Sequence, residues 1–195
     1  EASIVEFSPI TGNNSMGGSI GLLKGNVKIG SVSTTVNTTG NLIKCVNGNQ
    51  KYFGGVVGRM TEGCIIDDAQ LKGKAETAKL VTDAGYVGGI AGAVEAGCTV
   101  SDMLGEVPVD IEGSYDVSGY VGYLSGGILG SSGKTLDIKN IKTVKATSAG
   151  EKQKYGTGSL VGVIDNSGIV KWDKVSVTLA EGSNVEGGFN TGGLI

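Results

Sequence analysis

Aspartates recur at equivalent positions along the sequence, each four or five residues after a glycine expected to form a turn. They are the side chains best suited to bind a cation. Carboxylate oxygens would suit calcium better than a transition metal. The calcium candidates are Asp68, Asp102 and Asp173. Aspartate is also a favoured turn residue, and the chain has no D-x-D-x-D-G loop. We therefore favour a corner-turn role and expect no cofactor, with calcium as the alternative.

The chain contains no histidine and a single arginine, Arg59, which excludes several chemistries. Ser/His/Asp and Cys/His catalysis, zinc held by histidine and an imidazole pH switch all need a histidine. A polysaccharide lyase or hydrolase would need paired carboxylates and a suitably placed base. Asp68 and Asp102 could be such carboxylates, but Arg59 lies nine residues before Asp68, at an earlier corner. We predict no enzymatic activity and no catalytic residue, with a polysaccharide-degrading β-helix as the less favoured alternative.

Two of the three cysteines occupy equivalent places. Cys64 and Cys98 each follow a turn glycine and lie 34 residues apart, so we expect them to stack in adjacent repeats. Parallel Cβ vectors suit disulfide geometry poorly, and free cysteine packs as a small hydrophobe. We favour two reduced, buried cysteines and predict no metal site.

Aromatic and lysine side chains are the candidates for recognising a partner. Tyr52, Tyr86 and Tyr120 recur at 34-residue intervals and predict a stacked column. Such a column packs neighbouring repeats together or, where exposed, forms an interaction stripe. The binding-face candidates are Tyr52, Tyr86, Tyr120, Trp172, Lys152, Lys154 and Tyr155. The last three lie in a lysine-rich segment that predicts either solvated surface or a projecting loop where partners dock.

A repeated scaffold must position these residues, and its signature is glycine, at 36 of 195 residues against a usual share of about 7%. Gly-x-x-x-Gly units with an apolar filling begin at Gly17, Gly54, Gly88, Gly122 and Gly158, and a further unit begins at Gly192. The steps between them are 37, 34, 34, 36 and 34 residues. A turn glycine follows each full unit, at Gly25, Gly63, Gly97, Gly133 and Gly168. Such glycines mark a positive φ or a close approach of neighbouring repeats.

Between the glycines, apolar residues alternate with the period of a strand, as at Val107, Val109 and Ile111. Helical repeats are excluded because each interior glycine costs a helix about 1 kcal/mol. We predict an all-β, elongated β-solenoid, or β-helix, of about five coils with a 34–37 residue period, stacked at about 4.8 Å. Residues 1–15 form an N-terminal lead-in or cap, and residues 16–195 form one repeat solenoid domain, expected to be part of a longer chain.

Charge and hydropathy exclude two classes of partner. The net charge is −3, with 16 basic and 19 acidic residues and no basic patch, so no nucleic-acid binding is expected. No run of about 18 apolar residues is present, so no membrane span is expected in this segment.

The pattern of an aromatic residue, then Gly-Gly-Val/Ile-x-Gly, a short gap, glycine and a strand resembles the GLUG repeats of bacterial surface proteins. Those repeats occur in large adhesins and in IgA-protease-type proteins. The best copies begin at Tyr52 and Tyr86, each followed by its turn glycine, Gly63 or Gly97. The likeness covers about residues 16–195. It implies an extracellular or bacterial cell-surface location and no enzymatic activity of the repeats.

We therefore expect a non-enzymatic repeat module of a secreted or cell-surface bacterial protein that binds a ligand. Its partner would be a host or cell-surface protein or a glycan, with a host glycoprotein or immunoglobulin as examples, and neighbouring repeats of the parent chain would contact its ends. The alternative is a structural spacer, or a self-assembling stalk or filament subunit, in which open strand edges pair with the next subunit.

Overall fold

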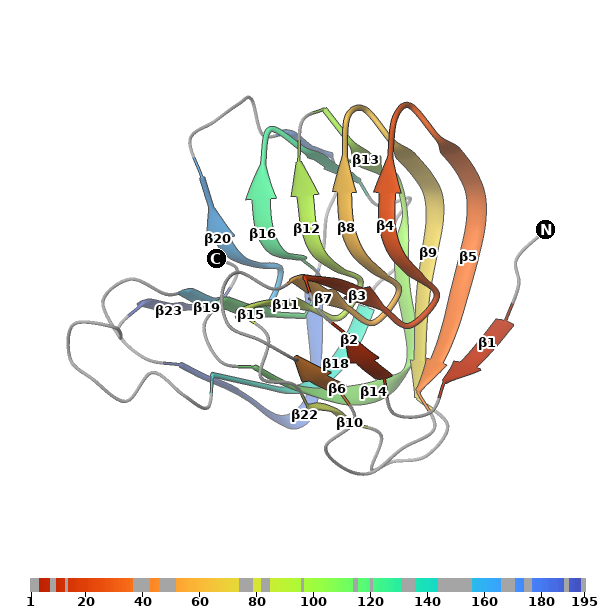
Figure 1. Cartoon of the computed structure of the whole chain (residues 1–195). Coiled ribbons are helices and arrows are strands. Elements are labelled where there is room, and N and C mark those ends of the chain that lie inside the picture. The colour runs from red at the N-terminus through yellow and green to blue at the C-terminus, as the bar shows by residue number, and fades with distance from the viewer. Residues whose placement is uncertain are drawn as a thin grey trace.

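Every described element of the protein is a β-strand in the computed structural model (Figure 1). The described residues are 4–7, 10–12, 14–36, 43–45, 52–73, 79–81, 85–95, 97–113, 116–119, 121–130, 136–143, 156–165, 171–173, 177–187 and 190–193. All the strand pairs among them are parallel. The all-β prediction is confirmed. Within these ranges, no helix has the length and apolar character needed to cross a membrane.

Two of the sheets are built from short strands. The five-stranded sheet contains, in spatial order, β20 (Val161–Ile164), β16 (Val121–Ser125), β12 (Ala91–Glu95), β8 (Val57–Thr61) and β4 (Ile20–Lys24). The six-stranded sheet contains β23 (Asn190–Gly192), β19 (Gly156–Gly158), β15 (Asp116–Ser118), β11 (Tyr86–Gly88), β7 (Tyr52–Gly54) and β3 (Ser15–Gly17). Figure 1 shows the strands of the five-stranded sheet side by side, in chain order.

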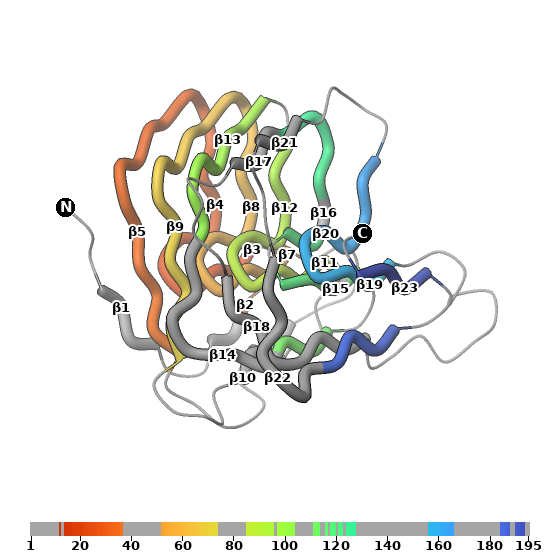
Figure 2. The backbone as a smooth tube through the Cα atoms, turned by 180° about the vertical axis from the view of Figure 1, so that it is seen from behind, coloured from red at the N-terminus to blue at the C-terminus, as the bar shows by residue number. Residues whose placement is uncertain are grey.

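The ten-stranded sheet contains the longest strands and faces the viewer in Figure 2. Its members are β1 (Ile4–Phe7), β5 (Lys28–Val36), β9 (Ile65–Gly73), β10 (Lys79–Val81), β13 (Thr99–Val100), β14 (Met103–Gly113), β17 (Ile128–Gly130), β18 (Leu136–Thr143), β21 (Lys171–Asp173) and β22 (Val177–Glu186). A separate pair joins β2 (Ile10–Gly12) to β6 (Ile43–Cys45).

The chain visits the three large sheets in a fixed cyclic order. Each circuit, called a coil below, passes from the six-stranded to the five-stranded and then to the ten-stranded sheet. The first coil is β3, β4 and β5, the second is β7, β8 and β9, and the third is β11, β12 and then β13 with β14. The fourth coil is β15, β16 and then β17 with β18, and the fifth is β19, β20 and then β21 with β22. Every strand of one coil therefore pairs with its counterpart in the next.

The core lies between the sheets, because alternate residues of each strand point inward and equivalent residues of successive coils stack. On the five-stranded sheet, Leu23, Met60, Val94 and Leu124 form one such column, and the last three have no exposed surface. Phe53 and Val87 continue the core on the six-stranded sheet. At about 25 cal/mol per Å² of buried apolar surface, this stacking is the main favourable term in folding.

Glycine is required at the corner where the six-stranded and five-stranded sheets meet. A Cβ atom on Gly54 would overlap the carbonyl oxygens of Val57 and Ile90, and one on Gly92 would overlap the backbone of Phe53 and Gly58. Neither glycine has a positive φ. Close approach of backbones, rather than backbone conformation, therefore requires glycine at positions 54 and 92.

Among the described glycines, positive φ occurs only at the other corner, between the five-stranded and ten-stranded sheets. Gly25, Gly63 and Gly97 have φ values of 83°, 76° and 75°, as expected for turn glycines. The fourth turn glycine was predicted to be Gly133, but the strand register and a φ of 67° assign that place to Gly126. Gly133 lies outside the described residues.

The predicted period of 34–37 residues is wrong for two coils. Ala91 pairs with Val121 and Val121 pairs with Val161, so these coils advance by 30 and 40 residues instead of 34 and 36. The fourth glycine unit is Ser118-Gly119-Tyr120-Val121-Gly122, not the unit that begins at Gly122. Ser118 takes the place of the first glycine, which hid the correct alignment.

Candidate functional site

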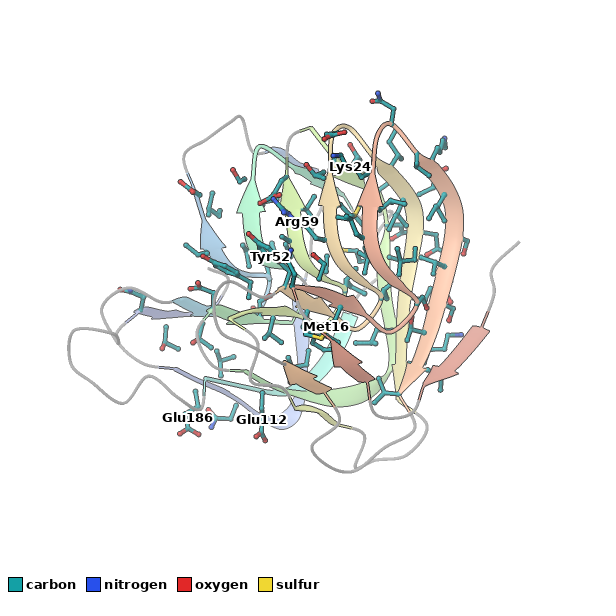
Figure 3. The ribbon with its side chains drawn as sticks, in the orientation of Figure 1. Met16, Lys24, Tyr52, Arg59, Glu112 and Glu186 are labelled. Atoms are coloured by element: carbon teal, nitrogen blue, oxygen red, sulfur yellow. The ribbon has the colours of Figure 1, made fainter. Side chains whose placement is uncertain are left out.

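The corner between β7 and β8 carries a cluster of aromatic and charged side chains from two consecutive coils. Tyr52 and Tyr86 are paired residues of β7 and β11, and their rings are stacked with centroids 5.2 Å apart and planes 14° apart. The guanidinium carbon of Arg59 lies 4.8 Å from the centroid of the Tyr52 ring. Figure 3 shows Arg59 and Tyr52 close together beside the five-stranded sheet. This cluster, completed by Glu95, is called the corner patch.

An ion pair across two coils holds Arg59 in place. Its Nε and Nη2 atoms lie 2.8 Å and 2.7 Å from Oε2 of Glu95, on β12. The side chain of Arg59 is 33% exposed and that of Glu95 is 14% exposed. An ion pair shielded from water in this way contributes more to the stability of the fold than an ion pair on the exposed surface. The pair and the cation–π contact together fix the orientation of the arginine.

Burial distinguishes the two tyrosines. Tyr52 is 8% exposed, and the burial of its ring raises the pKa of its hydroxyl, while the charge of Arg59 acts in the opposite direction. Tyr86 is partly exposed. Tyr52 therefore packs the two coils together, and the accessible part of the aromatic pair is Tyr86.

Removing the guanidinium should destabilise the protein measurably. We expect Arg59→Ala to lower the free energy of unfolding by about 1–3 kcal/mol, because Glu95 is left mostly buried without its cation and Tyr52 loses its cation–π contact. Lys24→Ala is the matched control, since the Lys24–Glu62 pair joins side chains that are 60% and 52% exposed and is worth about 0–1 kcal/mol. Urea unfolding of both variants measures the difference. Equal losses would contradict a special role for Arg59.

A buried carboxyl group follows the two tyrosines in the same column. Asp116 pairs with Tyr86 across β15 and β11 and is 3% exposed. Its Oδ1 atom accepts a hydrogen bond from the backbone N–H of Gly156, at 2.7 Å. Burial raises the pKa of Asp116 to about 7, although the Gly156 hydrogen bond acts to lower it. Asp116 thus joins the fourth coil to the fifth through its side chain.

The predicted aromatic column is therefore two tyrosines long. Tyr120 was expected to continue it, but the strand register puts Asp116 opposite Tyr86. The cause is the advance of only 30 residues from the third coil to the fourth. It places Tyr120 four residues after Asp116, the residue that pairs with Tyr86. Tyr120 itself lies outside the described residues.

The calcium candidates are not all brought together. Asp68 and Asp102 occupy the same position in neighbouring coils, directly before the paired residues Ala69 and Met103. Asp173 pairs with Gly130 and lies three coils from Asp68, one position away along the strand. Within the described part of the chain, no group of three or more acidic or cysteine side chains has the arrangement of a metal site.

The first two aspartates accept hydrogen bonds from their own coil and, for Asp68, also from the coil before it. Oδ2 of Asp68 accepts from Ser31 at 3.1 Å and from Gln70 at 2.7 Å. Oδ1 of Asp102 accepts from the backbone N–H of Met103 at 3.0 Å. Asp102 lies between β13 and β14, where a turn residue is expected, whereas Asp68 lies inside the strand β9 and pairs there with Ser31.

Cys64 and Cys98 stack as expected, and both are free and fully buried. The Cys64 N–H lies 3.2 Å from Sγ of Cys98, and Sγ of Cys64 lies 3.1 Å from the Thr61 carbonyl oxygen. Burial raises the pKa of the Cys98 thiol to about 11. Its backbone hydrogen bonds act to lower this pKa, and the nearby Cys64 thiol acts to raise it, both by smaller amounts. Because the thiolate is the nucleophilic form, Cys98 is suited to packing rather than to chemistry.

The other binding-face candidates are less fully placed. Trp172 lies on β21 and pairs with Leu129. Lys152, Lys154 and Tyr155 lie outside the described residues.

Sequence reasoning missed the Arg59–Glu95 ion pair and Asp116. An alignment that accepted serine at the first glycine position would have placed Asp116 in the tyrosine column.

Comparison of the chain with protein-family models, with curated proteins and with solved structures finds no match.

Proposed function

We propose that the chain is a β-solenoid that serves as a non-enzymatic, ligand-binding module of a secreted or cell-surface bacterial protein. The fixed cyclic order of parallel strands supports the solenoid, because it is the connectivity of a chain winding round one axis. Likeness of the glycine units to GLUG repeats supports the extracellular location. The binding role rests on the corner patch.

The observation that carries the proposal is the joining of side chains from consecutive coils into one fixed surface group. Tyr86 supplies a partly exposed aromatic ring, backed by the buried ring of Tyr52. Arg59 supplies a cation that is held by Glu95 and remains one-third exposed. A rigid aromatic and a fixed arginine are the residue types that dominate binding surfaces, since little conformational entropy is lost when a partner binds.

The chemistry of the patch fits a protein or glycan partner. A sugar ring or a peptide side chain can pack on tyrosine, and a guanidinium donates hydrogen bonds to hydroxyl, carbonyl or carboxylate oxygens. A host glycoprotein offers both kinds of group. The proposed partner is therefore a host or cell-surface glycoprotein, with immunoglobulin as a specific case.

A binding measurement tests this function. The purified chain is passed over immobilised immunoglobulin G, mucin and a glycan array, in calcium and in chelator. We expect saturable binding to at least one surface, weakened at least about tenfold by Tyr86→Ala and unchanged by Lys24→Ala. Circular dichroism establishes that each variant is folded.

Absence of binding to every surface, or binding that Tyr86→Ala leaves intact, would contradict the role of the corner patch. A signal lost in chelator would instead assign the ligand site to the aspartates at Asp68 and Asp102.

A further inference from the structure

The ion pair in the corner patch is neutral as a unit. The Nε and Nη2 atoms of Arg59 both lie within 2.8 Å of one carboxylate oxygen of Glu95, so one positive charge is matched by one negative charge. The strand neighbours of Arg59 are Leu22 and Ala93, and a strand neighbour of Glu95 is Ser125. None of these neighbours is charged. The patch therefore presents polar groups without a net charge of its own.

Charged side chains are few on the two sheets that meet at the patch. The described strands of the five-stranded and six-stranded sheets contain two cations and two carboxylates, which are Lys24, Arg59, Glu95 and Asp116. Figure 3 shows Lys24 at the opposite end of the five-stranded sheet from Tyr52, and the Asp116 carboxyl is buried. Within these strands, Arg59 is therefore the one cation that a ligand of the patch meets.

We propose that the ligand of the corner patch is an uncharged saccharide, bound through one hexose ring. The ring packs against Tyr86, and its hydroxyl groups bridge Arg59 and Glu95. This inference rests on the proposed function, because it names the class of ligand that the same patch takes. It separates neutral sugars from acidic sugars and from peptides, which the patch would also meet on a glycoprotein.

Hydroxyl groups match an intact ion pair better than peptide groups do. The guanidinium of Arg59 donates hydrogen bonds, and the carboxylate of Glu95 beside it accepts them. A hydroxyl both donates and accepts, so adjacent hydroxyls of a sugar satisfy both partners without separating them. A peptide N–H only donates and a peptide carbonyl only accepts, so a peptide must present both in one fixed arrangement. Hydrogen bonds to charged groups are also the stronger ones.

The aromatic part of the patch suits the apolar face of a hexose ring. Tyr86 is partly exposed, and its ring is held by stacking on Tyr52 with the centroids 5.2 Å apart. A hexose ring carries C–H groups on its faces and hydroxyl groups round its edge. Packing against the tyrosine buries the C–H groups, while the edge faces the ion pair, since the Arg59 guanidinium lies 4.8 Å from the Tyr52 centroid. One sugar ring thus contacts both parts of the patch.

An acidic ligand is disfavoured by the same ion pair. A carboxylate or sulfate that approached Arg59 would also approach Glu95, and like charges brought together at a binding surface weaken binding. Displacing Glu95 from the arginine would leave a carboxylate that is only 14% exposed without its cation, which is strongly unfavourable. The charge of Arg59 is therefore already satisfied within the molecule.

Titration calorimetry with matched sugars tests the class of ligand on the unaltered chain. The probes are oligosaccharides of galactose, glucose and mannose with those of the corresponding uronic acids, and lactose with sialyllactose. We expect the neutral member of at least one pair to bind at least about tenfold more tightly than its acidic counterpart. Its affinity should change less than about twofold between low and high salt, because the ligand carries no charge to be screened. Equal or tighter binding of the acidic members would overturn the inference.

Glu95→Gln tests the charge balance directly. Glutamine keeps an oxygen that accepts from Arg59 but removes the negative charge, so the acidic member of each pair should gain at least about tenfold in affinity relative to the neutral one. Lys24→Ala is the control and should leave the preference unchanged. Circular dichroism establishes that both variants are folded. An unchanged preference in folded Glu95→Gln protein would contradict the inference, and if that variant does not fold, the matched sugars and the salt dependence of the unaltered chain decide.

The outcomes separate this inference from the proposed function. A preference for acidic sugars that Tyr86→Ala abolishes would overturn the neutral class of ligand and keep the corner patch as the binding site. Binding to immunoglobulin G that depends on Tyr86 but survives enzymatic removal of the glycans would also overturn the saccharide and keep the function. Binding of sugar and protein that Tyr86→Ala leaves intact, or no binding at all, would contradict both.

Discussion

Replacing Asp116 with asparagine is expected to stabilise the protein at pH 8 by about 2–4 kcal/mol and to change its stability little at pH 4. The carboxyl group is 3% exposed, and its burial raises its pKa to about 7 from the 3.8 of an ordinary aspartate. Asparagine keeps an oxygen to accept the hydrogen bond from the Gly156 N–H and carries no charge. It therefore removes the cost of burying a carboxylate.

The direction of the pH dependence follows from that pKa. A raised pKa in the folded state means that the folded chain holds its proton more tightly than the unfolded chain does. The contribution of Asp116 to stability is fully present below about pH 4 and is lost as the pH rises to about 7. The protein should therefore unfold more easily at pH 8 than its other carboxylates alone would predict.

Urea unfolding at pH 4, 6 and 8 measures this effect. The difference in unfolding free energy between Asp116→Asn and the unaltered chain should increase with pH and level off above about pH 7. Asp165→Asn is the control, because Asp165 is an exposed carboxylate in the following coil. A difference that is constant across the pH range would show that Asp116 is not protonated in the folded protein.

Gly54→Ala is expected to destabilise the protein by at least about 3 kcal/mol. The added methyl group would overlap the carbonyl oxygens of Val57 and Ile90, and these are backbone atoms that cannot rotate away. Relief requires the second and third coils to separate at their shared corner. That separation would also loosen the core on either side of it.

Gly30→Ala is the matched control for this substitution. Gly30 is an exposed residue of β5, and a Cβ added there would have no heavy atom within 4 Å. Alanine at this position should change stability by less than about 1 kcal/mol, in the stabilising direction, because the unfolded chain loses conformational freedom. Thermal unfolding compares the two variants. Similar melting temperatures for both would contradict the close approach of backbones at the Gly54 corner.

The sequence was most informative where glycine was under a strong steric requirement. The units at Gly54 and Gly88, and the turn glycines after them, were located correctly, because a Cβ at Gly54 would overlap backbone atoms and Gly63 and Gly97 have positive φ. The stacking of Cys64 on Cys98 followed from the same alignment. Strand alternation was enough to identify an all-β protein.

The fourth coil was misaligned because Ser118 replaces the expected glycine and the coil before it is shorter. No second sequence feature fixes the register here. The glycine unit that begins at Gly122, four residues after Ser118, therefore fitted the repeat almost as well. The corner patch was missed for a different reason. Arg59 and Glu95 are 36 residues apart and meet diagonally across two strands, so neither lies at the position that a simple column would predict.

The hydrogen bonds that join one coil to the next run along the stacking direction, and this has a mechanical consequence. Tension applied between the two ends of the molecule would load the junctions between coils in series, so that each bears the whole force. The molecule would lengthen by losing one coil at a time, starting at the weakest junction, rather than by failing as a unit. The junction between the fourth and fifth coils, which depends on the Asp116 side chain, would then yield at a force that falls as the pH rises.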